Sequence, residues 1–123
     1  NATYRGYSST NYGVQFFTPG SSPSGAGDGQ DFAYINLDLN NVTSGLSFVE
    51  PGTYVAGGAE GGQMDKGYSK IVYADNTEVY LADGTVTFVK NDDGTYSVTL
   101  DLVFNNGKSY SGSYNGSIAD WMW

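Results

Sequence analysis

Alternating apolar and polar residues, separated by glycine-ended turns, constrain the fold of this chain more than any other feature. A period of two places successive side chains on opposite faces of a strand, and glycine supplies the left-handed backbone of tight turns. In the second half three such turns occur: Ala82-Asp83-Gly84, Asp92-Asp93-Gly94 and Asn105-Asn106-Gly107. Residues 78–118 are therefore predicted to form four strands of an antiparallel meander.

The strand registers follow from the need for opposed side chains to share one face, because a one-residue slip turns every side chain over. Three-residue bulged turns that end at Gly94 and Gly107 satisfy this rule. A two-residue turn at Asn106-Gly107 would instead bury serines and expose tyrosines. The predicted pairs are Phe88 with Val98, Val86 with Leu100, Leu102 with Tyr110, Leu100 with Gly112, and Val98 with Tyr114.

At the first turn the same rule favours a two-residue loop, Asp83-Gly84. This loop opposes Leu81 to Val86 and Val79 to Phe88. A three-residue loop would oppose a glutamate to Phe88, so the two-residue loop is predicted.

Length and composition predict one domain, residues 1–123, with a single core. The chain has 18 glycines and 11 tyrosines, and no segment shows a sustained helical repeat, so an all-β fold of eight or nine strands is expected. A two-sheet antiparallel sandwich with the C-terminal meander is the leading prediction, and a closed lipocalin-like barrel is the alternative. In the first half the expected strands are 2–7, 12–18, 32–39, a short one after the turn at 51–55, and 68–74, with glycine-rich connections at 19–29 and 56–66. Connection 19–29 is expected to be a mobile loop or a binding loop that orders on contact.

Charge and composition exclude several function classes. Five basic and thirteen acidic residues give a net charge of −8, which argues against nucleic acid and anionic membranes as partners. No apolar stretch is long enough for membrane insertion by this segment. The chain has no cysteine and no histidine, so thiol and imidazole catalysis and metal sites built on these residues are excluded. No cofactor is expected.

Carboxylate chemistry remains, but the pattern does not favour an enzyme. Glycoside hydrolysis needs two facing carboxyl groups with separated pKa values. Asp38, Glu78 and Asp101 lie within predicted strands, and the alternation turns Glu78 and Asp101 away from the apolar faces, so solvent-facing carboxylates are expected. Residues 28–31 and 91–94 bunch hard oxygen ligands that could suit calcium, but tight turns select the same residue types. No metal site is predicted.

The surplus of aromatic residues is the remaining functional clue. A tyrosine or tryptophan offers a flat apolar face and a polar tip, which suits stacking on a sugar ring or a protein interface. At least one of the two C-terminal indoles is expected to be solvent-accessible. The same residues could instead fill the core, plug its end, or line an apolar cavity. The predicted ligand-binding residues are Tyr34, Tyr73, Tyr80, Trp121 and Trp123.

Three stretches also carry a family resemblance: GTVTFVKNDDGTYSVTL at 84–100, GKSYSGSYNG at 107–116 with its G-x-x-x-x-G-x-Y-x-G pattern, and the turn PGTY at 51–54. They resemble the closing hairpins and an upstream turn of small exported proteins and lipoproteins from gut Bacteroidetes. The resemblance implies an exported β-sandwich, often linked to glycan capture at the cell surface, and it brings no catalytic residues. Those proteins carry a lipidated N-terminal cysteine, so an anchor or export signal would here precede Asn1. A secreted or cell-envelope location is expected.

Three functions from different classes follow as hypotheses. The first is a non-catalytic module that binds glycan by aromatic stacking, the second a structural or protein-interaction domain, and the third a carrier of a small apolar ligand in a barrel. A shallow groove with exposed aromatics would favour glycan, a flat apolar patch would favour a protein partner, and an enclosed cavity would favour the carrier.

Overall fold

Every regular element of the described chain is a β-strand. The computed structural model describes residues 2–6, 11–22, 25–42 and 50–120, and these contain no helix. The all-β class predicted from the sequence is therefore confirmed. The strands are β1 (Ala2–Gly6), β2 (Asn11–Phe17), β3 (Phe32–Asn40), β4 (Gly52–Gly57), β5 (Gln63–Asp65), β6 (Lys70–Tyr73), β7 (Glu78–Lys90), β8 (Tyr96–Phe104), β9 (Ser109–Gly116) and β10 (Ala119–Asp120).

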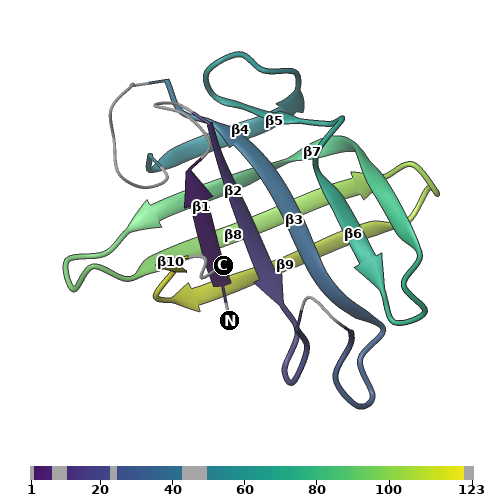
Figure 1. Ribbon diagram of the computed structural model, residues 1–123. Helices are drawn as coiled ribbons and strands as arrows, with labels where there is room; N and C mark the ends of the chain where they lie inside the picture. The colour runs from purple at the N-terminus through teal and green to yellow at the C-terminus, as the bar shows by residue number, and fades with distance from the viewer. Residues whose placement is uncertain (1, 7–10, 23–24, 43–49, 121–123) are drawn as a thin grey trace.

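The strands form two layers that are joined into one continuous sheet. β1, β2 and β3 run side by side, and β7, β8 and β9 cross behind them at a steep angle (Figure 1). β6 pairs with both β3 and β7, while β5 pairs with β3 and, through β4, reaches β7 at the other end. The strands β3, β5, β4, β7 and β6 thus close into a five-stranded barrel. The fold therefore has the two layers of the predicted sandwich, and it also contains a closed barrel, which was the alternative prediction.

Two of the three predicted turns are confirmed, together with their registers. Gly94 and Gly107 have φ angles of +86° and +79°, and each donates its N–H across the turn, to the carbonyl groups of Asn91 and Phe104. All five pairs predicted for these two hairpins are observed, including Phe88 with Val98 and Leu102 with Tyr110.

The prediction for the first turn is wrong. Leu81 lies opposite Phe104 rather than Val86, and Val79 lies opposite Ile71 rather than Phe88. The segment is one long strand, β7, whose register on β8 shifts near Asp83, so the meander has three strands instead of four. Glycine is needed here because β8 approaches closely and not because the chain turns.

The shift of register near Asp83 allows β7 to pair with two different strands along the same edge. Its first residues pair with β6, and its last residues pair with β4. A bulge bends a strand and increases its twist, which matches this change of partner. The connection expected at residues 56–66 likewise contains a strand that was not predicted, β5, which links β3 to β4.

The core lies between the two layers and gathers aromatic rings around Phe88. The ring centres of Phe16, Tyr54 and Tyr96 lie 6.3, 5.8 and 6.2 Å from that of Phe88, and the two tyrosines stand nearly perpendicular to it. Edge-to-face pairs of this kind add roughly 0.5–1.5 kcal/mol each beyond the apolar area that they bury. Alternate residues of β3 and β8 supply much of the remaining core, as the sequence pattern predicted.

Candidate functional site

Aromatic and polar side chains gather on the outer face of β3, β6 and β7. The inner residues of β3, among them Ile35 and Leu37, are buried, so alternation turns their neighbours outward. The registers then place Asn36, Lys70 and Tyr80 in one row across the three strands. We call this surface the tyrosine face; it comprises Tyr34, Asn36, Tyr68, Lys70, Glu78 and Tyr80.

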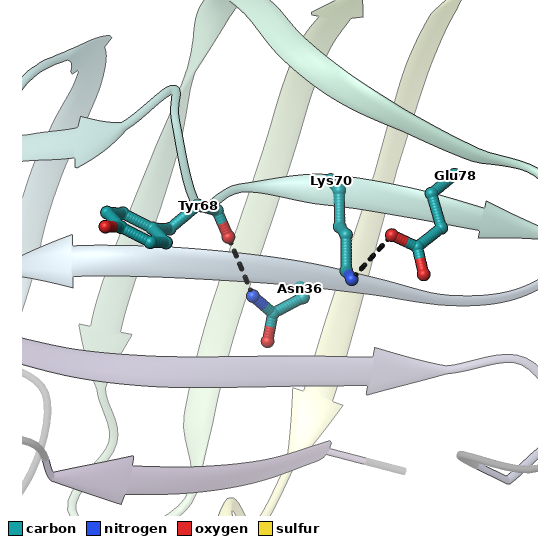
Figure 2. A network of polar contacts seen from close by, with 4 residues as sticks. All are labelled: Asn36, Tyr68, Lys70 and Glu78. Carbon is teal, nitrogen blue, oxygen red and sulfur yellow. Dashed lines mark hydrogen bonds and ion pairs between the residues drawn. The ribbon is translucent and has the colours of Figure 1, made fainter.

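A polar network occupies the middle of the tyrosine face (Figure 2). The Asn36 side-chain amide donates a hydrogen bond to the Tyr68 carbonyl group at 3.0 Å, and the Lys70 ammonium lies 2.9 Å from the Glu78 carboxylate. Burial lowers the pKa of Lys70, but the hydrogen bond and charge of Glu78 outweigh it, so the pKa is raised overall. Lys70 therefore stays charged in the neutral pH range.

Tyr68 and Tyr80 are the most accessible rings of the face. Their exposed fractions are 67% and 40%. Tyr68 ends a tight turn in which its N–H donates to the Asp65 carbonyl group and the Gly67 N–H donates to the Asp65 carboxylate. Sequence reasoning missed Tyr68 because the run 68–74 was interpreted as one strand. The Asp-Lys-Gly sequence before it is the signal that could have identified the turn.

An open groove lies beside Tyr80. It has a volume of about 600 Å³, which falls within the range of roughly 300–1,000 Å³ that is usual for small-molecule sites. Because it is open, it can accept a ligand that extends along the surface. The residues that line it are Lys66, Gly67, Tyr80, Leu81, Ala82 and Asn105.

The other predicted site residues have different placements. Tyr34 is half-buried on the tyrosine face, and its ring lies 5.3 Å from that of Phe17 on β2. Tyr73 was expected to face outward with Val72 inward, and this is wrong: Val72 lies opposite Tyr34 on the outer face, whereas Tyr73 packs against the core. The reason is the register of β6, which places Ile71 opposite Ile35 on the inner face.

Tyr73 takes part in a separate set of contacts. Its hydroxyl group accepts a hydrogen bond from the Asn106 amide at 3.2 Å, and the Lys108 ammonium lies 5.7 Å from its ring centre. The structure does not bring it together with Tyr34 and Tyr80. The predicted residues Trp121 and Trp123 lie outside the described residues, so the predicted exposure of an indole stays a prediction.

A second, smaller hollow lies between the layers at the side of β9. Its volume is about 200 Å³, below the usual range for ligand pockets. We call it the aromatic mouth; it is lined by Phe16, Phe17, Thr18, Pro19, Phe32, Ile35, Leu100, Tyr110, Ser113 and Tyr114.

The three carboxylates within strands, those of Asp38, Glu78 and Asp101, have separate surroundings and do not face one another as a pair. Glu78 pairs with Lys70, Asp101 is exposed on β8, and Asp38 is half-buried beside Asn11, whose amide lies 2.6 Å from its carboxylate. Burial raises the pKa of Asp38, and the nearby charge of Asp65 adds to this effect. Among the described residues, no group of three or more acidic side chains is close enough together to hold a metal ion.

At residues 91–94, one of the two acidic turns that suggested calcium, a carboxylate holds the backbone of the turn. The Asp93 carboxylate accepts hydrogen bonds from the N–H and the hydroxyl group of Thr95, at 3.0 and 2.6 Å. These bonds lower the pKa of Asp93.

The described residues include no helix with the length and hydrophobicity needed to span a membrane.

The comparisons with known proteins add no further constraint. No family model matches the chain, and neither the curated proteins nor the solved structures contain a significant match.

Proposed function

We propose that the protein is a non-catalytic binding module that takes glycan on the tyrosine face. The observation that carries the proposal is the presence of two exposed rings, Tyr68 and Tyr80, beside polar groups. Tyr80 lies opposite Lys70 across the two strands, and the Tyr68 carbonyl group accepts the Asn36 amide. A sugar ring has apolar C–H faces, which stack on aromatic rings, and equatorial hydroxyl groups, which need donors and acceptors at the rim. The tyrosine face offers both on one surface.

The dimensions of the face suit a short oligosaccharide. Three adjacent strands contribute to it, and neighbouring strands lie roughly 4.8 Å apart, so the row from Asn36 to Tyr80 extends about 10 Å. The open groove beside Tyr80 continues the surface toward Lys66. Rigid strands hold five of the six side chains, all except Tyr68, and such positioning reduces the ordering cost of binding.

The ion pair contributes specificity for a neutral ligand. Lys70 and Glu78 neutralise each other at 2.9 Å, so the face carries hydrogen-bonding groups without a strong local charge of one sign. An anionic ligand would also be opposed by the net charge of −8. Neutral polysaccharides are therefore the ligand class that we expect.

A carrier of a small apolar ligand is less well supported. The aromatic mouth has a volume of only about 200 Å³, and pockets for such ligands usually reach 300 Å³ or more. Outside the tyrosine face, the exposed apolar side chains Val55, Val89 and Val103 lie on the neighbouring strands β4, β7 and β8. Their partners across the strands are Thr85, Ser97 and Asp83, so these three side chains form no continuous apolar patch for a protein partner.

Location remains part of the proposal. Glycan capture fits the resemblance to exported proteins and lipoproteins of gut Bacteroidetes, so we propose that the protein acts outside the cell or in the cell envelope.

The proposal is tested by screening the protein on an array of neutral glycans and measuring the affinity of any bound glycan by calorimetry. Tyr68→Ala should lower that affinity about five- to twelvefold, because one stacked ring contributes about 1–1.5 kcal/mol. Val103→Ala, an exposed change on β8, is the matched control and should leave the affinity unchanged. Absence of binding on the array, or equal affinity for the Tyr68 variant, would contradict the proposal.

A further inference from the structure

β9 forms one end of the sheet and has a free edge. In the part of the chain that the structure describes, β9 pairs with β8 alone. It is eight residues long, which is a long edge for a domain of this size. A free edge presents unpaired N–H and C=O groups that can pair with another strand.

The residues that usually protect an edge strand are missing from β9, and no other described strand pairs with its free edge. Natural edges are blocked by proline, by charged side chains within the strand, or by a covering element. β9 contains no proline and no charged residue; Lys108 precedes its first residue. Its backbone is therefore open to pairing along most of its length.

The hydrogen-bond pattern identifies the groups that point outward. The Phe104 N–H donates to the Lys108 carbonyl group at 2.9 Å, and the two ladder directions alternate along an antiparallel pair. The N–H and C=O groups of Tyr110, Gly112 and Tyr114 therefore face β8. Those of Ser109, Ser111, Ser113 and Asn115 face the free edge.

The sequence of β9 is nearly symmetric about its centre. Residues 109–115 read Ser-Tyr-Ser-Gly-Ser-Tyr-Asn. A second β9 in antiparallel orientation, centred on Gly112, would place Ser111 opposite Ser113 of the second copy and Tyr110 opposite Tyr114 of the second copy. The serine pairs would then be the hydrogen-bonded pairs of the new ladder.

The tyrosines of β9 are already held in place by the core. The Tyr110 ring lies 5.4 Å from that of Phe32, and the Tyr114 ring lies 5.7 Å from that of Phe16. These contacts fix one face of the strand against the aromatic mouth, so pairing at the edge requires little further ordering.

We propose that β9 is the interface of a two-fold symmetric homodimer, in which the two β9 strands pair antiparallel around Gly112. A strand that is symmetric in sequence suits an isologous contact, because the same surface meets itself. The tyrosine face lies on other strands, β3, β6 and β7, so this interface is independent of glycan binding.

The test is sedimentation equilibrium over a range of protein concentrations. The native protein should rise from the mass of one chain to that of two and should then stop, because a two-fold contact closes on itself. Ser111→Lys with Ser113→Lys opposes like charges at both serine pairs and should weaken association at least tenfold. In the single chain the lysine at position 111 lies near Asp101, the acceptor for the Ser111 hydroxyl group, so folding should be retained.

Two further variants make the test specific. Ser111→Lys with Ser113→Glu opposes unlike charges in the predicted register and should restore the dimer. Thr99→Lys places the same charge on the neighbouring strand β8, away from the edge, and should leave association unchanged. A circular dichroism spectrum and a melting temperature for each variant show that it has folded.

Three outcomes would overturn the proposal. The native protein could keep the mass of one chain at every concentration, which would leave β9 open to an extended segment of a different protein. Its mass could rise beyond two chains, which indicates an open contact. Association could also survive Ser111→Lys with Ser113→Lys, which places the interface elsewhere.

Discussion

A Cβ atom on Gly84 would overlap the carbonyl oxygen of Asp101 on the neighbouring strand. The same atom would lie 2.8 Å from the Cα atom of Leu102, and the φ angle of Gly84 is +120°. Both steric overlap and backbone conformation therefore require glycine where β7 shifts its register on β8. The irregularity that allows β7 to pair with β6 and β4 depends on this close approach.

Gly84→Ala should lower the free energy of unfolding by roughly 3 kcal/mol. The unfavourable backbone contributes about 1–3 kcal/mol, and the overlap with β8 contributes a similar amount. Gly94→Ala is the matched control, since Gly94 has a φ angle of +86° but no atom within 4 Å of its added Cβ. Urea denaturation measures both; equal losses for the two variants would mean that β8 does not restrict Gly84.

Asp38→Asn should stabilise the protein at neutral pH. The pKa of Asp38 is raised in the folded state, first by burial and then by the charge of Asp65. A raised pKa means that the folded state binds its proton more tightly, so the carboxylate destabilises the fold above the folded pKa and ceases to do so below the unfolded value near 4. The gain from Asp38→Asn should therefore be present at pH 7 and disappear near pH 3.

Asp75→Asn provides a control of opposite sign. Hydrogen bonds from Thr77 lower the pKa of the exposed Asp75 carboxyl group, so its charge favours the folded state above the unfolded pKa. Melting temperatures measured between pH 3 and pH 7 should diverge in opposite directions for the two variants. The account of Asp38 fails if its variant is equally stabilising, or destabilising, at both ends of this range.

Tyr54→Phe should cost about 0.5–1.5 kcal/mol of stability, the typical contribution of a hydrogen bond within a protein. The Tyr54 hydroxyl group lies 2.5 Å from the Glu50 carbonyl group and 2.9 Å from the Asn41 side-chain oxygen, and it can donate to one of them at a time. Burial, followed by the charge of Glu50, raises the pKa of Tyr54, so the group stays a donor across the neutral range. Tyr73→Phe removes a hydroxyl group whose hydrogen bond with Asn106 is exposed, and it is expected to change the stability by less than about 0.5 kcal/mol. A similar loss in both variants would argue against a special role for Tyr54.

Gln15→Met should increase the stability by about 1 kcal/mol. The side-chain oxygen of Gln15 is buried and has no hydrogen-bond partner within the described residues, and such a group costs about 1–3 kcal/mol. Methionine has a similar length and no polar atom. Gln63→Met should be destabilising, because the Gln63 oxygen accepts a hydrogen bond from the Gly58 N–H at 2.9 Å. Thermal unfolding that shows a loss at Gln15 would contradict this interpretation.

Short-range patterns predicted the fold where turn chemistry and side-chain alternation agree. Gly94 and Gly107 end hairpin turns as predicted, and the alternation of side chains around Gly94 predicted the pairing of Phe88 with Val98. Gly84 misled the prediction because a turn and a bulge select the same residue. A glycine required by a neighbouring backbone cannot be distinguished from one required by a turn until that backbone is placed.

The candidate site was predictable only in part, for the same reason. Alternation within β3 and β7 turned Tyr34 and Tyr80 outward correctly. In β6 both Ile71 and Val72 are buried, so the alternation of this short strand is not visible in its sequence, and Tyr73 was assigned to the wrong face. Tyr68 owes its exposure to a turn, and Lys70 meets Glu78 only because β6 and β7 pair.

The most direct test of the proposed function is the affinity of an array-selected neutral glycan for three proteins: the native chain, Tyr80→Phe and Tyr80→Ala. Tyr80 is 40% exposed between the polar network and the open groove, and stacking requires its ring but not its hydroxyl group. Calorimetry should give nearly native affinity for Tyr80→Phe and about five- to twelvefold weaker binding for Tyr80→Ala. Equal affinity for the native chain and Tyr80→Ala would contradict the proposal that the tyrosine face binds glycan.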